Sequence, residues 1–163
     1  MLEATGLDFP DALSAGAAAA HLGGAVLLTD GDAQAPETAS YLSAHPSPKR
    51  YTVGGEAAAA DPAATPIFGA DRYATAAQVA EQLFGAPSTF GAALGTNYPD
   101  ALAGAAHIGA LGGPLLLVGA SAPLPTPTAG YLSNTATLTG GYLYGGTAAV
   151  GDDVLGELDA AIA

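Results

Sequence analysis

The sequence GTNYPDALA at residues 95–103 repeats the sequence GLDFPDALS at residues 6–14. Both copies continue through an alanine-rich stretch into Leu-Gly-Gly, at residues 22–24 and 111–113, and then into a short apolar run. The offset between the two copies is 89 residues (95 minus 6). A fixed period of this kind indicates that a structural unit occurs twice in the chain.

Apolar runs of strand length alternate with helical stretches along both copies, which predicts an α/β fold. Connections of only a few residues imply parallel strands, right-handed crossovers and helices on both faces of each small sheet. We expect strands at residues 1–5, 25–29, 49–53, 89–94, 115–118 and 141–144, and helices at residues 10–22, 36–44, 56–60, 70–84, 99–111, 126–133 and 152–162.

An Ala- and Pro-rich stretch at residues 61–66 is the predicted boundary between the units, so we assign residues 1–63 to the first repeat and 64–163 to the second. The second repeat opens with FGADRYATA at residues 68–76, which has no counterpart in the first. The counterpart of Arg72 would fall before residue 1. We therefore expect the first repeat to lack its N-terminal strand and helix, and a signal peptide or earlier repeats to precede it in the natural protein.

The composition limits the possible partners. Fifteen acidic residues and three basic ones, Lys49, Arg50 and Arg72, give a formal net charge of −12, which argues against nucleic acid or an anionic membrane surface. The absence of cysteine excludes disulfides and thiolate chemistry, and no apolar run approaches the ~20 residues of a membrane helix. An anionic ligand would have to use these three cations, backbone amides or a bridging cation such as calcium.

Four phrases carry a family resemblance: FGADRYATA (68–76), NYPDAL (97–102), GPLLL (113–117) and YGGTAAV (144–150). In order and spacing they resemble the bacterial cell wall-binding repeat 2 family, over about one and two-thirds modules. The resemblance implies tandem Rossmann-like (flavodoxin-like) modules, usually in threes around a pseudo-threefold axis. Such modules anchor secreted or surface-layer proteins to an anionic wall polymer.

The function expected from the resemblance is non-catalytic anchoring at the cell wall or cell surface, without a cofactor or bound metal. Expected partners are an anionic polysaccharide or teichoic-acid-like polymer, and adjacent repeats or a second copy of the chain; nucleic acid and membrane insertion are not expected. One alternative is a structural module for surface-layer self-assembly. Another is a Rossmann-type nucleotide-binding enzyme, which is disfavoured because neither glycine-rich phosphate-binding fingerprint is present.

Candidate ligand-binding residues follow from charge and from the glycine pairs. Arg72 suits a phosphate or carboxylate, although it can instead form an ion pair with Asp71, Asp100 or an acid of the other repeat. Glycine pairs after strands can cradle an anion with their amides or simply form tight turns. The candidate binding residues are Arg72, Asp71, Gly54, Gly55, Gly145 and Gly146.

Other polar residues are expected to serve the fold. Asp11 and Asp100 follow a proline at predicted helix starts, where a carboxylate caps free amides, and Thr75 belongs to the same phrase as Arg72. Neither of these two aspartates lies near a His or Ser at a spacing that suggests a catalytic pair. The histidines at positions 21, 45 and 107 have no metal-ligand spacing.

Overall fold

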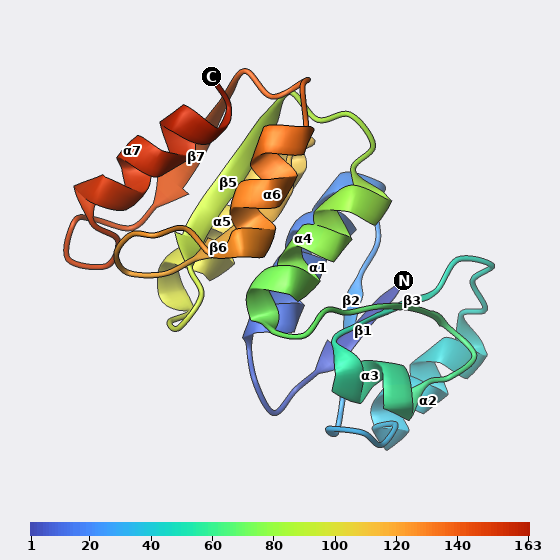
Figure 1. Ribbon diagram of the computed structural model, residues 1–163. Coiled ribbons are helices and arrows are strands. Elements are labelled where there is room, and N and C mark those ends of the chain that lie inside the picture. Colours follow the sequence, from blue (N-terminus) through green and yellow to red (C-terminus); the bar gives the residue numbers. More distant parts are fainter.

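Two separate parallel sheets, each flanked by helices, form two modules that lie side by side in the computed structural model, which describes residues 1–163 (Figure 1). The first module comprises β1 (Leu2–Thr5), α1 (Pro10–Leu22), β2 (Val26–Thr29), α2 (Pro36–Ala44), β3 (Tyr51–Val53), α3 (Gly55–Ala60) and β4 (Thr65–Ile67). The second comprises α4 (Arg72–Leu83), β5 (Thr89–Leu94), α5 (Pro99–Ala110), β6 (Leu115–Val118), α6 (Thr126–Asn134), β7 (Gly140–Tyr144) and α7 (Asp152–Ala161).

The strand orders of the two sheets correspond. The first sheet has the order β2-β1-β3-β4 and the second the order β6-β5-β7, and all neighbouring strands are parallel. The central strands β1 and β5 each precede one copy of the Pro-Asp-Ala-Leu phrase, so this phrase starts the helix that leaves the middle of each sheet. The predicted α/β architecture with tandem modules is confirmed.

The strand β4 lies in the part of the chain that the sequence assigned to the second repeat, but it pairs with β3 of the first sheet. Ile67 is fully buried in the core that the two modules share. Pro66 is tolerated because β4 is an edge strand, where a missing amide hydrogen bond costs little. The first sheet therefore extends to Ile67, and the second module begins structurally with α4.

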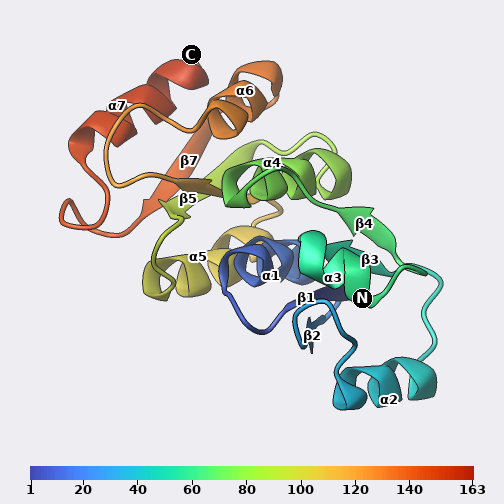
Figure 2. The same cartoon turned by 60° about the horizontal axis from the view of Figure 1, so that its bottom comes forward.

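Helices α1 and α5 form the seam between the modules, and Figure 2 shows them next to each other. Small side chains allow this close approach: Ala17 of α1 and Ala105 of α5 are buried in one apolar cluster. A Cβ atom placed on Gly109 of α5 would clash with the carbonyl oxygen of Ala17 and lie 2.7 Å from the Cβ of Ala20. The repeated alanine-rich helices thus pack on one another as well as on their own sheets.

Helix α4 covers the β6 side of the second sheet and also contacts α1 and α6. Tyr131 of α6 is buried in a cluster with two alanines of α4, and this burial raises the pKa of its hydroxyl to about 12. The first module has no helix in the corresponding place. In the first module Tyr41, the counterpart of Tyr131, and Leu28, the counterpart of the buried Leu117, are consequently exposed. None of the helices has both the length and the apolar character needed to cross a membrane.

Candidate functional site

The phrase at residues 68–76 builds the start of α4. Asp71 is the N-cap residue, and its Oδ1 accepts a hydrogen bond of 2.8 Å from the amide of Ala74. The Thr75 hydroxyl accepts a hydrogen bond of 3.1 Å from the amide of Gly69, and a Cβ atom on Gly69 would lie 2.7 Å from the carbonyl carbon of Ala74. Asp71 and Thr75 therefore fix the turn that presents Arg72.

Asp71→Ala is expected to lower the free energy of unfolding by about 1 kcal/mol, the usual value of an N-cap carboxylate. Asp71→Asn is the matched control, because an amide oxygen accepts the same hydrogen bond from Ala74. Urea unfolding followed by circular dichroism measures both variants. Equal stability of the alanine variant and the unmodified protein would contradict the capping role.

Arg72 connects the two modules. Its Nη1 donates to the carbonyl oxygen of Gly95, at the end of β5, over 2.7 Å. Its Nη2 lies 3.5 Å from Oδ2 of Asp8 in the first module, and the guanidinium carbon is 5.8 Å from the centre of the Phe9 ring. The partner of Arg72 is thus an acid of the other module, while about a third of the side chain, 31%, stays exposed.

A groove of about 390 Å³ opens beside Arg72 at the seam. Phe9 and Tyr98, which occupy the same position in the two repeats, meet there with ring centroids 5.8 Å apart. The Asp8 side chain is 53% exposed, and Leu7 is exposed on the rim. We call this hollow the seam groove; it is lined by Thr5, Gly6, Leu7, Asp8, Phe9, Ala12, Leu28 and Tyr98.

The first glycine of each pair lies against a repeated aspartate. The expectation that Asp11 and Asp100 cap their helices was wrong, because neither helix start has a side-chain cap hydrogen bond. Gly54 and Gly145 both have positive φ, 95° and 115°. A Cβ atom on Gly54 would lie 2.7 Å from Cγ of Asp11, and one on Gly145 would lie 2.9 Å from Oδ2 of Asp100. In each module the aspartate carboxylate therefore lies beside the glycine turn, where an external anion would be repelled.

The Asp11 carboxyl is partly buried, and this desolvation raises its pKa, with Asp8 and Glu56 adding repulsion and Arg72 opposing them. Because the folded state binds its proton more tightly than the unfolded chain, this group stabilises the fold below its ordinary pKa of 3.8. The contribution is lost as the pH rises from that value through the raised pKa of the folded state.

Asp11→Asn is therefore expected to raise the free energy of unfolding at neutral pH and to leave it nearly unchanged at a pH below 3.8. Urea unfolding at both pH values tests this. Asp100→Asn serves as the matched control in the second module. A loss of stability at neutral pH in the Asp11 variant would show that its charge supports the fold.

One polar cluster was not expected from the sequence. Glu3, on the central strand β1, is fully buried and accepts hydrogen bonds from Gln34 over 2.8 Å and from Arg50 over 3.3 Å. Arg50 also pairs with Asp61, at the end of α3. The one indication of this cluster in the sequence is the position of Glu3 between the apolar residues Leu2 and Ala4 of a strand. Of the three cations only Lys49 forms no salt bridge.

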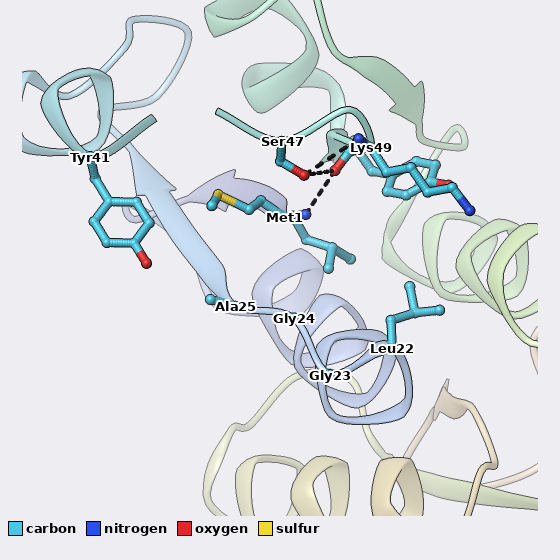
Figure 3. Close-up of a pocket in the computed structure, with 10 residues that line it drawn as sticks. Met1, Leu22, Gly23, Gly24, Ala25, Tyr41, Ser47 and Lys49 are labelled. Atoms are coloured by element: carbon cyan, nitrogen blue, oxygen red, sulfur yellow. Dashed lines mark hydrogen bonds between the residues drawn. The ribbon is translucent and has the colours of Figure 1, made fainter. Parts of the chain in front are cut away.

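A larger hollow of about 560 Å³ lies at the start of β1 and β3, at the opposite end of the first sheet from the seam groove. Figure 3 shows Tyr41 and Met1 on its sides, and Ser47 hydrogen-bonded to the backbone of Lys49. Met1 also lines it through its amino group, which donates to the Lys49 carbonyl over 2.9 Å. No Asp or Glu lines this hollow.

The histidines lie in different places. His21 stacks on Phe84 and His45 on Tyr41, while His107 contacts Tyr144. No three His, Asp or Glu side chains come together as a group that could hold a metal ion.

Comparisons with known proteins place this arrangement in a family. The model of the cell wall binding domain 2 (CWB2) family matches residues 1–63 and 67–155. A search of curated proteins found no match. Among solved structures, Cwp6 from Clostridium difficile matches with a TM-score of 0.83 and 20% identity, over 98% of this chain and 27% of that one. Cwp8 from the same organism matches with a TM-score of 0.73 and 24% identity, over 98% of this chain and 29% of that one.

This chain thus spans less than a third of the length of either solved protein. The structural likeness agrees with the two-module fold, and the family model covers both modules. The chain belongs to the cell wall binding domain 2 (CWB2) family.

Proposed function

We propose that this chain is a non-catalytic module that anchors a secreted or surface-layer protein to a polymer of the bacterial cell wall. The observation that carries the proposal is the match of the CWB2 family to both modules. A family that binds cell walls acts at the cell surface. The seam groove is the binding site that we propose, because it has two aromatic rings and an exposed rim, and Arg72 contacts two of its lining residues, Asp8 and Phe9.

Arg72, which contacts Asp8 and Phe9 beside this groove, is the proposed anion-binding group. A guanidinium has five N–H donors in a planar fork, and the two contacts to Gly95 and Asp8 leave others for a ligand. Asp71 and Thr75 contribute by holding the turn. Gly54, Gly55, Gly145 and Gly146 are weaker candidates, because Asp11 and Asp100 lie against the two turns.

The acidity of the chain sets a condition on the ligand. With a net charge of −12, long-range attraction of an anionic polymer is unfavourable. Arg50 is held by Glu3 and Asp61, which leaves Arg72 and Lys49 as accessible cations. An anionic polysaccharide or teichoic-acid-like chain would then bind through local contacts at the seam, with or without a bridging divalent cation.

A pull-down on purified wall polymer tests the proposal, with and without a chelator and over a range of salt concentrations. The informative variant is Asp8→Asn, because it removes the acid that competes for Arg72. We expect tighter retention of this variant than of the unmodified chain, and weaker retention of Arg72→Ala. Arg72→Lys keeps the positive charge but lacks the planar fork of donors, so it shows whether retention depends on charge alone or on bidentate hydrogen bonds. No retention of the unmodified chain under any condition would refute the proposal.

One observation favours assembly as a second role. Leu13 of α1 is 4% exposed at the seam, whereas its repeat counterpart Leu102 on α5 is 61% exposed. Ala106, the counterpart of buried Ala17, is exposed as well. The surface of α5 that corresponds to a covered surface of α1 is thus free, as expected if an adjacent repeat or a second copy packs on it.

Mass in solution tests this second role. We expect the isolated chain to associate in a concentration-dependent way, and Leu102→Glu to abolish the association. Leu155→Glu, on the exposed side of α7, is the matched control. A monomer at all concentrations would contradict self-association and leave only an adjacent repeat as the occupant.

A further inference from the structure

We infer that the second module carries a separate subsite for an uncharged pyranose ring, built around Tyr142 on the edge strand β7. The inference rests on the proposed wall-binding function, since it names a sugar component of the polymer. It concerns a different surface from the seam groove, and none of its residues is needed for the contacts of Arg72.

Aromatic side chains form the first part of this subsite. Tyr142 and Tyr144 project from the same face of β7, with ring centroids 6.4 Å apart and an interplanar angle of 14°. His107 of α5 meets the Tyr142 ring edge-on at 5.0 Å, and its Nδ1 lies 2.8 Å from the Tyr144 hydroxyl. These contacts fix the orientation of Tyr142, whose side chain nevertheless remains 46% exposed.

Glycines make this arrangement possible. A Cβ atom on Gly104 would lie 2.6 Å from Cγ of Tyr144, and one on Gly91 would lie 2.7 Å from its Cε2. Tyr144 therefore occupies space that only glycine leaves open between α5 and the sheet, and it supports Tyr142 from one side. An ordered, exposed ring has little conformational entropy to lose when a flat ligand packs on it.

Hydroxyl and backbone groups form the second part. A shallow hollow of about 350 Å³ adjoins Tyr142 at the start of β5 and β7, and its other lining residues include three with hydroxyl groups, Ser88, Thr89 and Thr139. Gly140 and Gly141 complete it, and a Cβ atom on Gly140 would meet nothing within 4 Å. Because β7 pairs only with β5, its outer edge also leaves backbone donors and acceptors free.

The chemistry of the hollow selects an uncharged ligand. No Lys, Arg, Asp or Glu lines it, so it offers an anionic group no counter-charge. A pyranose has a face of C–H groups, which pack on the electron-rich face of an aromatic ring. It also has hydroxyl groups that both donate and accept hydrogen bonds, as the threonine and serine hydroxyls do.

The first module lacks this combination. Tyr51 corresponds to Tyr142, but Val53 stands in place of Tyr144 and Ala18 in place of His107. The stacked pair and its histidine support are therefore confined to the second module. The subsite is consequently expected once in this chain, even though the fold occurs twice.

Titration of the ¹⁵N-labelled chain with uncharged methyl glycosides of glucose, galactose, mannose, rhamnose and N-acetylglucosamine tests the inference by NMR. We expect amide shifts at Thr89, Thr139, Gly140 and Gly141 with at least one of them. Tyr142→Ala should weaken the binding about tenfold, whereas Tyr142→Phe keeps the ring and should bind within about twofold of the unmodified chain.

Phe68→Ala removes a similarly exposed aromatic ring outside this hollow and is the matched control. Absence of these shifts with all five glycosides, or equal binding by Tyr142→Ala and Tyr142→Phe, would overturn the inference. Co-sedimentation of the same variants with cell walls separates the two proposals. If the unmodified chain sediments but the glycosides cause no shifts, the anchoring function stands and the pyranose subsite does not.

Discussion

Gly109→Ala is expected to lower the free energy of unfolding by about 1–3 kcal/mol, although alanine is the better helix former. The added methyl group would lie 2.7 Å from the Cβ of Ala20 and 3.0 Å from the Cα of Ala17. Backbone atoms of α1 cannot move aside as a flexible side chain can, so α1 and α5 must separate. The variant therefore tests the seam between the modules directly.

Gly16→Ala is the matched control, because Gly16 belongs to α1 and faces the same seam. Its added Cβ atom would lie 3.8 Å from the Cβ of Ala105, an ordinary van der Waals distance. This variant is expected to gain up to about 1 kcal/mol from helix propensity. Urea unfolding measures both. If both variants changed the free energy of unfolding in the same direction, α1 and α5 would not pack as described.

Gly54→Ala is expected to destabilise the first module by about 2–3 kcal/mol, because alanine at a φ of 95° is strained. The added Cβ atom would also displace the Asp11 carboxylate, whose Cγ would be 2.7 Å away. Both effects arise at the end of β3, where the chain turns into α3.

The neighbouring residue supplies the control. Gly55 has ordinary backbone angles, and an added Cβ atom would meet nothing within 4 Å. Gly55→Ala is therefore expected to be neutral or slightly stabilising at the start of a helix. Thermal unfolding of both variants, followed by circular dichroism, separates them. A Gly54 variant as stable as the Gly55 variant would contradict the strained turn.

Much of the fold was predictable because its signals are local. Helix α1 occupies residues 10–22, as the proline at its first position and the glycine pair after it predicted. The repeat then predicted α5, whose span differs from the expected one by a single residue. Apolar runs between turn residues likewise predicted the buried strands β5 and β6.

Less local features were not predictable in the same way. The strand β4 has three residues, one of them proline, and thus lacks the pattern of a strand. Its position depends on the short connection after α3, which returns the chain beside β3. The expected start of β3 at residue 49 was also wrong, since pairing with β1 begins at Tyr51.

In the candidate site, too, residues with a local sequence signal were predictable and features that depend on packing were not. The sequence singled out Arg72 as a rare cation, and the alternative of an ion pair with an acid of the other repeat matches its contact with Asp8. The seam groove itself depends on how the modules pack, which the repeat period does not specify. Glu3 and Arg50, 47 residues apart, meet only because β1 and β3 are neighbours in the sheet.

Co-sedimentation of the chain with bacterial cell walls, compared before and after removal of the phosphodiester-linked polymers with hydrofluoric acid, tests the anchoring function most directly. We expect the chain to sediment with the intact walls and to stay in solution with the stripped walls. Equal sedimentation with both preparations would contradict binding to a phosphodiester-linked anionic polymer, and sedimentation with neither would contradict the proposal that this CWB2 module anchors proteins to the wall.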